Sequence, residues 1–376
     1  MKDTILFGDC RESLKTIANS DTRARMCVTS PPYYGLRDYG TATWIGGDPN
    51  CNHRRDTKVK PENCNTGHKN HDEMSGVGDA IYKASCPKCG AIRQDSQIGL
   101  EQSPEEYVKE MVKVFSLVRD CLTDDGTLWL NIGDSYYNYR SDGNYPKQTV
   151  SKTRQDLPQS TPVRGNKLEG LKQKDLIGIP WMLAFALRAD GWYLRQDIIW
   201  HKPNPMPESV KDRCTKSHEY IFLFSKNKKY FYDNEAIKEP AKDWGTRDRT
   251  KGKYHNEGTG LQPHSGLSKS YPTKNKRSVW SITNKPYRGA HFAVYPPDLI
   301  EPCIKAGSEK GDIVLDPFMG SGTTAAVAKS LGRDYIGCEL HENYGDLIRK
   351  RVSEYHVPIE VVSQNGLTDL LDSAIL

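Results

Sequence analysis

The sequence predicts an α/β fold, built on a doubly wound and mostly parallel sheet with inserted loops and small subdomains. Two observations predict it. Short apolar runs typical of buried strands alternate with longer segments typical of amphipathic helices. Near the carboxyl end, a strand passes through a glycine-rich turn directly into a helix. A chain of 376 residues suffices for two domains, or for one large domain with insertions.

The amino-terminal half supplies the first alternating elements. We expect a strand at residues 3–10 that continues into a helix, and a second strand that starts near residue 24 and stops at two prolines. After a long polar stretch, Ser103 as a cap and Pro104 as the first residue predict a helix. Residues 124–136 predict a turn followed by a buried strand.

The carboxyl-terminal half continues the alternation. The expected elements are a helix at 175–191, a strand at 192–205, a hairpin at 219–233, a helix at 296–307, a strand at 312–318, a glycine turn and helix at 320–332, and a strand and helix at 334–352. Strands that alternate with helices in this way predict parallel pairing.

Basic residues are concentrated in the middle of the chain. The whole chain has a formal net charge of +5, whereas residues 201–290 alone hold 19 lysines and arginines against 9 aspartates and glutamates. Residues 139–175 hold 8 against 4. This asymmetry indicates a nucleic-acid contact surface, although a pair of solvated basic loops would give the same pattern.

No part of the sequence indicates a membrane or an export route. The amino terminus, MKDTILFGDC, lacks the apolar stretch of a signal peptide, and no apolar run approaches the length of a membrane span. Ten cysteines in such a chain favour reduced thiols or a metal site over disulfides. We therefore expect a cytoplasmic protein that does not contact a membrane.

The second strand ends in Ser30, Pro31, Pro32 and Tyr33. Each proline lacks an N–H group and has a fixed φ, so the pair ends the strand in a rigid corner. This corner presents a hydroxyl, bare carbonyls and an aromatic ring. A purely structural turn with a packed tyrosine would have the same sequence.

Residues 314–340 form a βαβ unit around the sequence DPFMGSGTT. Gly320 and Gly322 let the backbone approach a ligand, and the helix that follows offers unpaired N–H groups. Asp316 would repel a pyrophosphate but suits a positively charged ligand such as S-adenosylmethionine. Glu339 ends the next strand, where an acidic residue can accept both hydroxyls of a ribose.

Together, the two motifs resemble the DNA amino-methyltransferases, which methylate the exocyclic nitrogen of cytosine (N4) or adenine (N6). TSPPY comes first and DPFMGSGTT last, which looks like the permuted order of the family's beta class. The resemblance covers nearly the whole chain and implies a Rossmann-like fold that uses S-adenosylmethionine. It implies a cofactor site made of Asp9, Phe292, Pro296, Asp316, Phe318, Gly320, Ser321, Gly322, Thr323, Thr324 and Glu339.

The same resemblance makes the corner at residues 30–33 the catalytic site. An exocyclic amino group is a poor nucleophile because its lone pair is conjugated with the ring. Acceptors at its two protons favour a pyramidal nitrogen, and Ser30 Oγ and the Pro31 carbonyl are suitable, while Tyr33 can stack on an extruded base. Within the family, SPPY is more typical of cytosine N4, so we expect that target, with adenine N6 as the alternative.

The resemblance also divides the chain into regions. We expect residues 1–45 and 97–204 to form the catalytic half, with the target-base pocket, and residues 286–376 to form the cofactor-binding half. Residues 205–285 are expected to recognise the target sequence. Residues 46–96 are a polar insertion rich in cysteine and histidine.

Four residues of the insertion, Cys51, His53, Cys86 and Cys89, are the expected ligands of a structural zinc ion. Cys-x-x-Cys followed by glycine resembles a zinc knuckle, and a metal would stabilise an insertion that is too polar to build its own core. A loop with unliganded thiols remains the alternative, and further cysteine and histidine residues lie between the two pairs.

The expected partner is double-stranded DNA. Candidate phosphate contacts are Lys202, Lys211, Arg213, Lys216, Lys274, Lys276 and Arg277. The chain has no endonuclease motif, so a restriction endonuclease would be a separate protein or absent, and a homodimer is compatible with the sequence. An RNA or protein-amide methyltransferase and a non-enzymatic zinc-dependent DNA-binding protein are the alternative functions.

Overall fold

The computed structural model describes residues 1–35, 43–53, 85–94, 97–137, 168, 170–241, 272–284 and 295–355. The chain divides into two compact units, of which the larger comprises residues 1–33 and 102–376 and the smaller residues 34–101. Within the described residues, no helix is both long enough and apolar enough to cross a membrane.

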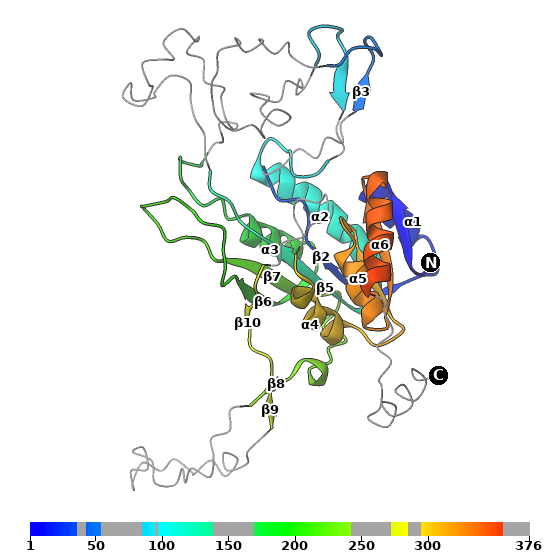
Figure 1. The fold of residues 1–376 in the computed structure, drawn as a ribbon, viewed down its shortest axis with the longest axis vertical. Coiled ribbons are helices and arrows are strands. Elements are labelled where there is room, and N and C mark those ends of the chain that lie inside the picture. The colour runs from blue at the N-terminus through cyan, green and yellow to red at the C-terminus, as the bar shows by residue number, and fades with distance from the viewer. Residues whose placement is uncertain are drawn as a thin grey trace, which may run out of the picture. The chain divides into compact units, whose positions relative to one another are not determined.

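The larger unit is built on one eight-stranded sheet (Figure 1). Its strands follow the order β1 (Thr4–Phe7), β12 (Asp334–Glu339), β11 (Ile313–Asp316), β2 (Ala24–Thr29), β5 (Leu122–Ile132), β7 (His218–Ser225), β6 (Tyr193–His201) and β10 (Val279–Ser281). The first five strands pair in parallel, and β10 is parallel to β6. Only β7 is antiparallel to its neighbours in this sheet. The expected doubly wound, mostly parallel sheet is confirmed.

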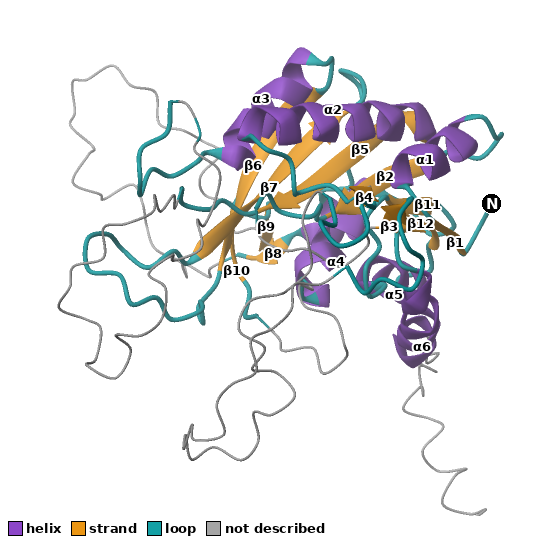
Figure 2. Ribbon diagram, turned by 90° about the horizontal axis from the view of Figure 1, so that it is seen from above, coloured by secondary structure: helices purple, strands orange, loops and turns teal. Residues whose placement is uncertain are grey.

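Helices cover both faces of the sheet (Figure 2). One face carries α1 (Cys10–Ala18), α2 (Pro104–Cys121) and α3 (Ile179–Ala189), and the other carries α4 (Pro297–Gly307), α5 (Thr323–Ser330) and α6 (Gly345–Tyr355). The remaining elements are β8 (Glu239–Pro240), which pairs with β9 (Thr273–Lys274), and the short 3₁₀ helices η2 (Glu235–Ile237) and η4 (Glu342–Tyr344).

Helix α2 starts where the sequence predicts. Ser103 Oγ accepts a hydrogen bond from the backbone N–H of Glu106 at 3.2 Å, and Pro104 occupies the first turn, where its missing N–H is not needed. The Glu106 carboxylate accepts from the N–H of Gln102 at 3.1 Å. The first bond satisfies a donor that the first helical turn leaves unpaired, and the second ties the residue before the cap to the helix.

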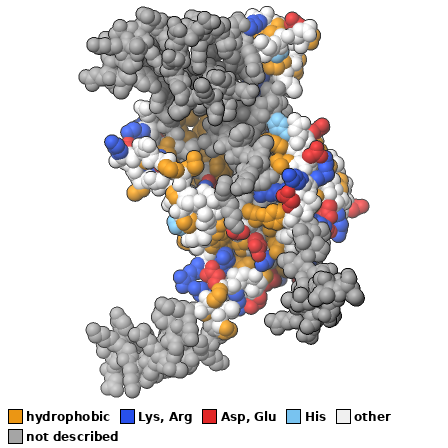
Figure 3. Space-filling view, in the orientation of Figure 1, with side chains coloured by type: hydrophobic (Ala, Val, Ile, Leu, Met, Phe, Trp, Pro, Cys, Tyr) orange, Lys and Arg blue, Asp and Glu red, His pale blue; other side chains and the backbone are white. Residues whose placement is uncertain are grey.

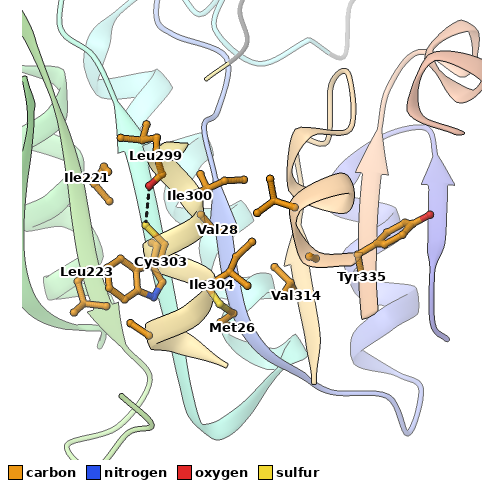
Figure 4. Packing of buried hydrophobic residues seen from close by; sticks show 14 of the residues in the cluster. Met26, Val28, Ile221, Leu223, Leu299, Ile300, Cys303, Ile304, Val314 and Tyr335 are labelled. Carbon is orange, nitrogen blue, oxygen red and sulfur yellow. Dashed lines mark hydrogen bonds between the residues drawn. The ribbon is translucent and has the colours of Figure 1, made fainter. Parts of the chain in front are cut away.

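Helix α4 packs against the core face of the main sheet (Figure 4). Its buried residues Leu299, Ile300, Cys303 and Ile304 face the strands of the sheet. The opposing side chains are Met26 and Val28 of β2, Val314 of β11, and Ile221 and Leu223 of β7. Each buried side chain of this size contributes about 1.5–3 kcal/mol, so this packing fixes the strands whose ends carry the site.

The expected hairpin at residues 219–233 is wrong. The strand β7 ends at Ser225, and its hairpin partner is the preceding strand β6. Both edges of β7 are already paired, with β5 and with β6, so no edge is left for a second strand. The following segment instead bonds to the first part of β5, where Phe231 N donates to the carbonyl of Asp125.

The smaller unit contains a two-stranded antiparallel sheet. It consists of β3 (Thr43–Ile45) and β4 (Ile92–Gln94). The candidate metal ligands of this unit lie in the two segments that follow β3 and precede β4.

Candidate active site

The carboxyl edge of the main sheet brings the two sequence motifs together. Strand β11 ends at Asp316 and its neighbour β2 ends at Thr29, directly before Ser30. Strand β12, on the other side of β11, ends at Glu339. Residues separated by 287 positions in the sequence therefore lie on adjacent strand ends, where open α/β sheets bind their ligands.

Asp316 links these strand ends through four hydrogen bonds. Its Oδ1 accepts from Thr29 Oγ1 at 2.6 Å and from the N–H of Phe318 at 3.0 Å, and its Oδ2 accepts from Thr324 Oγ1 at 2.5 Å and from Tyr295 Oη at 3.2 Å. The side chain is 1% exposed, and this burial raises the pKa of the carboxyl group. These partners surround the carboxylate, so it would act on a bound cation through its charge and not by direct contact.

The glycine loop needs the backbone conformations that its sequence offers. Gly320 and Gly322 have φ angles of 55° and 82°, in the left-handed region that favours glycine. A Cβ at residue 322 would also lie 2.9 Å from Cγ2 of Ile348. No side chain caps the first turn of α5, and the neighbouring Ser321 Oγ accepts from Arg351 at 2.6 Å. The loop thus presents backbone N–H groups at a helix start.

Glu339 closes the loop from the end of β12. Its Oε2 accepts from the N–H of Gly320 at 2.8 Å, and its Oε1 accepts from the N–H of His341 at 2.9 Å. The side chain is 8% exposed, and burial raises the pKa of its carboxyl group. Each oxygen keeps a lone pair for a further donor. This chemistry fits the ribose of S-adenosylmethionine, and two buried carboxylates fit its positive charge.

The other expected cofactor residues differ in where they lie. Asp9 caps α1 and accepts from Arg11 Nε and Nη2 at 2.9 and 2.6 Å. Burial alone would raise the pKa of Asp9, but the hydrogen bonds and charge of Arg11 lower it. Pro296 is buried at the start of α4, where its carbonyl accepts from Leu299 N. Thr323 is buried at the first position of α5, and Phe292 lies outside the described residues.

The Ser-Pro-Pro-Tyr corner is held by hydrogen bonds to strand β7 and helix α2. Tyr33 Oη donates to Glu219 Oε2 at 2.8 Å and lies 3.5 Å from Ser30 Oγ. The carbonyl of Pro32 accepts from Tyr107 Oη of α2 at 2.8 Å. Burial and the negative charge of Glu219 raise the pKa of Tyr33, so its hydroxyl stays protonated.

Three residues of this corner were not foreseen from the sequence. Glu219, the second residue of β7, forms an ion pair with Lys202, and Asn131 Nδ2 donates to the same carboxylate at 3.3 Å. A Cβ at Gly133 would lie 2.7 Å from Cε2 of Tyr33, so glycine is required for the close approach. The available signal was the position of all three, at strand ends on the carboxyl edge.

The four candidate metal ligands of the smaller unit converge. The ligand atoms of Cys51, His53, Cys86 and Cys89 all lie within 4.8 Å of one another. The two sulfurs of Cys51 and Cys86 are 3.8 Å apart, and Cys89 Sγ is 3.5 Å from His53 Nδ1. Zn–S bonds of about 2.3 Å and Zn–N bonds of about 2.0–2.1 Å in a tetrahedron place two sulfurs about 3.8 Å apart and sulfur and nitrogen about 3.5 Å apart. These two separations are close to those of a tetrahedral zinc site.

Local backbone geometry supports this cluster. Gly90 N donates to the carbonyl of Cys86 at 2.7 Å, and Cys86 N donates to the carbonyl of Ala91 at 2.8 Å, which forms a tight turn around the Cys-x-x-Cys segment. A Cβ at Gly47 would lie 2.8 Å from Cys89 Sγ. Cys64, His68 and His71 lie outside the described residues.

Several basic residues expected to contact DNA have partners within the protein. Arg213 lies 2.6 Å from a carboxylate oxygen of Glu208, and Lys216 Nζ donates to the carbonyl of Asp134 at 2.8 Å. Burial lowers the pKa of Lys216, although the negative charges of Asp134 and Glu219 partly oppose this effect. Lys202 is engaged with the Tyr33 corner, as described above.

The remaining basic candidates are more open. Lys276 lies 3.3 Å from Glu239, and Lys274 is half-buried in β9. Lys211 and Arg277 are exposed. On the face shown in Figure 3, basic and acidic side chains lie next to one another.

Comparison with known proteins identifies similar chains. A family model for DNA methylases, N6_N4_Mtase, matches residues 24–350. Type II methyltransferase M.SmaI of Serratia marcescens is 40% identical over 353 residues, which cover 93% of this chain and 90% of that protein. Type II methyltransferase M.XycI of Xanthomonas campestris pv. cyanopsidis is 39% identical over 349 residues, which cover 93% and 87%. The fold is similar to that of the cytosine-N4-specific PvuII DNA methyltransferase, with a TM-score of 0.51, 15% identity and coverage of 99% of this chain and 92% of that one.

Proposed function

Because the chain belongs to the N6/N4 family of DNA methylases, we propose that it transfers a methyl group from S-adenosylmethionine to the exocyclic N4 of cytosine in double-stranded DNA. The observation that carries the proposal is the 2.6 Å hydrogen bond between Thr29 and Asp316. It joins the strand that leads into Ser30 to the strand that leads into the glycine loop, so a base and a cofactor would meet at one place.

The cofactor-binding half would hold S-adenosylmethionine through groups already described. Glu339 would accept hydrogen bonds from the ribose, the loop at Gly320 and Gly322 would allow close approach of the backbone, and Phe318 would offer an apolar surface. Asp316 would favour the cation through its negative charge. When bound, the cofactor supplies an electrophilic methyl group on a positively charged sulfur.

The catalytic corner would prepare the amino group as a nucleophile. Ser30 Oγ and the carbonyl of Pro31 would accept its two protons and favour the pyramidal nitrogen, with the proline ring fixing the carbonyl direction. Tyr33 would stack against the extruded base, and transfer would be direct. The buried cysteines Cys27, Cys303 and Cys338 have no role in this scheme, and burial raises the pKa of all three thiols.

Ser30 supports cytosine N4 over adenine N6. By family resemblance, a leading serine is more typical of cytosine-specific enzymes, whereas aspartate or asparagine is more typical of adenine-specific ones. All three side chains can accept a hydrogen bond from an amino group, so this difference alone does not separate the two bases. Adenine N6 is therefore the second candidate target.

The smaller unit would bind a structural zinc ion through Cys51, His53, Cys86 and Cys89. Its support is the match between the measured separations and tetrahedral zinc geometry. The metal would hold together two segments that also pair in a short two-stranded sheet. It would have no part in methyl transfer.

The cellular setting follows from the same family membership. The relatives named above are Type II methyltransferases, which supports a role in restriction and modification, beside a separate endonuclease or without one. We propose that the protein acts in the cytoplasm on double-stranded DNA. A homodimer stays a prediction, as does the assignment of residues 205–285 to target recognition.

A substrate comparison tests the proposal. Purified protein is incubated with methyl-tritiated S-adenosylmethionine and, in parallel, with double-stranded DNA, RNA and a glutamine-containing peptide. We expect label in DNA alone, loss of transfer but not of cofactor binding in Pro31→Ala, and loss of cofactor binding in Gly320→Val. Label in RNA or in the peptide would support the alternative methyltransferases, and absence of cofactor binding would support a non-enzymatic DNA-binding protein.

A further inference from the structure

A carboxylate that has no place in the scheme above lies against the catalytic corner. We propose that Glu219 is a positioning residue, which orients the hydrogen bonds from Ser30 through Tyr33 so that Ser30 Oγ faces the target amino group as an acceptor. This inference rests on the proposed function and adds to it the residue that fixes the polarity of the corner.

The direction of the hydrogen bonds from Ser30 through Tyr33 to Glu219 follows from the distances between their oxygen atoms. Tyr33 has one hydroxyl proton, and the nearest acceptor is Glu219 Oε2 at 2.8 Å, against 3.4 Å to Asn131 Oδ1 and 3.5 Å to Ser30 Oγ. An ionised carboxylate can only accept, so Tyr33 donates to Glu219. The raised pKa of Tyr33 keeps that proton in place. Tyr33 Oη can then only accept from Ser30, whose proton points away from the base.

The carboxylate of Glu219 is itself held firmly. Its Oε1 pairs with Lys202 Nζ, and its Oε2 also accepts from Asn131 Nδ2 at 3.3 Å. The side chain of each ion-pair partner is 17% exposed. Glu219 is the second residue of β7, and the next residue, Tyr220, pairs with Ile132 at the end of β5. Both strands belong to the main sheet, so the backbone that carries Glu219 is fixed, and these hydrogen bonds hold its carboxylate.

A serine at the corner needs such an orienting group. An aspartate could only accept hydrogen bonds, whereas a serine hydroxyl both donates and accepts. If Ser30 pointed its proton at the base, that proton would face the N–H groups of the amino group. Ser30 would then not accept from them, and the lone pair of the amino nitrogen would stay conjugated with the ring. A fixed series of hydrogen bonds that ends on a carboxylate sets the direction of the Ser30 proton before the base arrives. This is preorganisation in the sense used for catalytic sites.

Glu219→Gln is the decisive variant because it keeps the shape but replaces one acceptor with a donor. The amide N–H facing Tyr33 would donate to Tyr33 Oη. The direction of the hydrogen bonds would then be reversed, and the Tyr33 proton would turn toward Ser30. We expect the single-turnover rate of DNA methylation to fall about ten- to a hundredfold, as for the loss of one preorganised polar partner. The Kd for S-adenosylmethionine should be unchanged. Glu301→Gln, which removes a surface ion pair with Lys305 on α4, is the matched control and should keep the wild-type rate.

A double-mutant cycle separates positioning from general structural support. Tyr33→Phe keeps the ring and removes the hydroxyl, so it should slow methylation by a similar factor. In that background, Glu219→Gln should cost little more, because Glu219 acts through the missing hydroxyl. Costs that multiply, a wild-type rate in Glu219→Gln, or a wild-type rate in Tyr33→Phe would each overturn the inference. Wild-type protein that transfers no methyl group to DNA would instead overturn the proposed function.

Discussion

Gly133 leaves no space for a side chain beside Tyr33, so Gly133→Ala tests whether the position of Tyr33 controls the rate. A Cβ at residue 133 would lie 2.7 Å from Cε2 of Tyr33 and 3.3 Å from Cγ and Cδ of Glu219. Carbon atoms in contact are about 3.5–4.0 Å apart, so the ring would have to shift by roughly 1 Å. The backbone of Gly133 lies outside the left-handed region, so alanine adds no backbone strain there.

The expected cost follows from this shift. A misplacement of about 1 Å in a catalytic site costs about a hundredfold in rate, or roughly 2.7 kcal/mol in activation free energy. Single-turnover methylation of DNA by Gly133→Ala measures the rate, and calorimetric titration with S-adenosylmethionine measures the cofactor affinity. We expect the rate to fall by about this factor and the affinity to stay unchanged. A variant that methylates as fast as the wild type would refute the role of Tyr33.

Three further predictions concern the carboxylates and the metal. Glu339→Gln should weaken the binding of S-adenosylmethionine about tenfold, because charge-assisted hydrogen bonds are lost, and an unchanged calorimetric affinity would argue against the ribose contact. Chelation or Cys89→Ser should release zinc and make residues 43–53 and 85–94 sensitive to protease, and digestion at the wild-type rate would argue against the metal. Burial raises the pKa of Asp316, so the folded state binds the proton of this carboxyl group more tightly than the unfolded chain does. The free energy of unfolding of the wild type should therefore fall relative to that of Asp316→Asn as pH rises above about 4. Denaturant unfolding of both proteins at pH 4 and pH 7 should show this trend, and a difference that does not vary with pH would contradict it.

Elements with local signals were predictable from the sequence. Ser103 and Pro104 gave the start of α2, and the order strand, glycine turn, helix and strand predicted residues 314–340. Such signals depend on residues a few positions apart, so they can be recognised without knowledge of the fold. The cysteine–histidine set was also predictable by type, and the structure brings its four ligand atoms together.

Contacts between distant strands were not predictable. Tyr33 meets Glu219 across 186 residues, and Tyr295 shares the Asp316 carboxylate with Thr29. These neighbours depend on strand order, which no local pattern specifies. The incorrect hairpin has the same cause, because the pairing of β7 on both edges is a property of the whole sheet.

The identity of the methylated base tests the central claim most directly. DNA treated with the protein and S-adenosylmethionine is digested to nucleosides, and mass spectrometry separates N4-methylcytosine from N6-methyladenine. With Ser30 as the leading acceptor of the corner, we predict N4-methylcytosine in the treated DNA and none in DNA treated with Pro31→Ala. N6-methyladenine in its place would contradict the cytosine assignment, and the absence of any methylated base would contradict the proposed reaction itself.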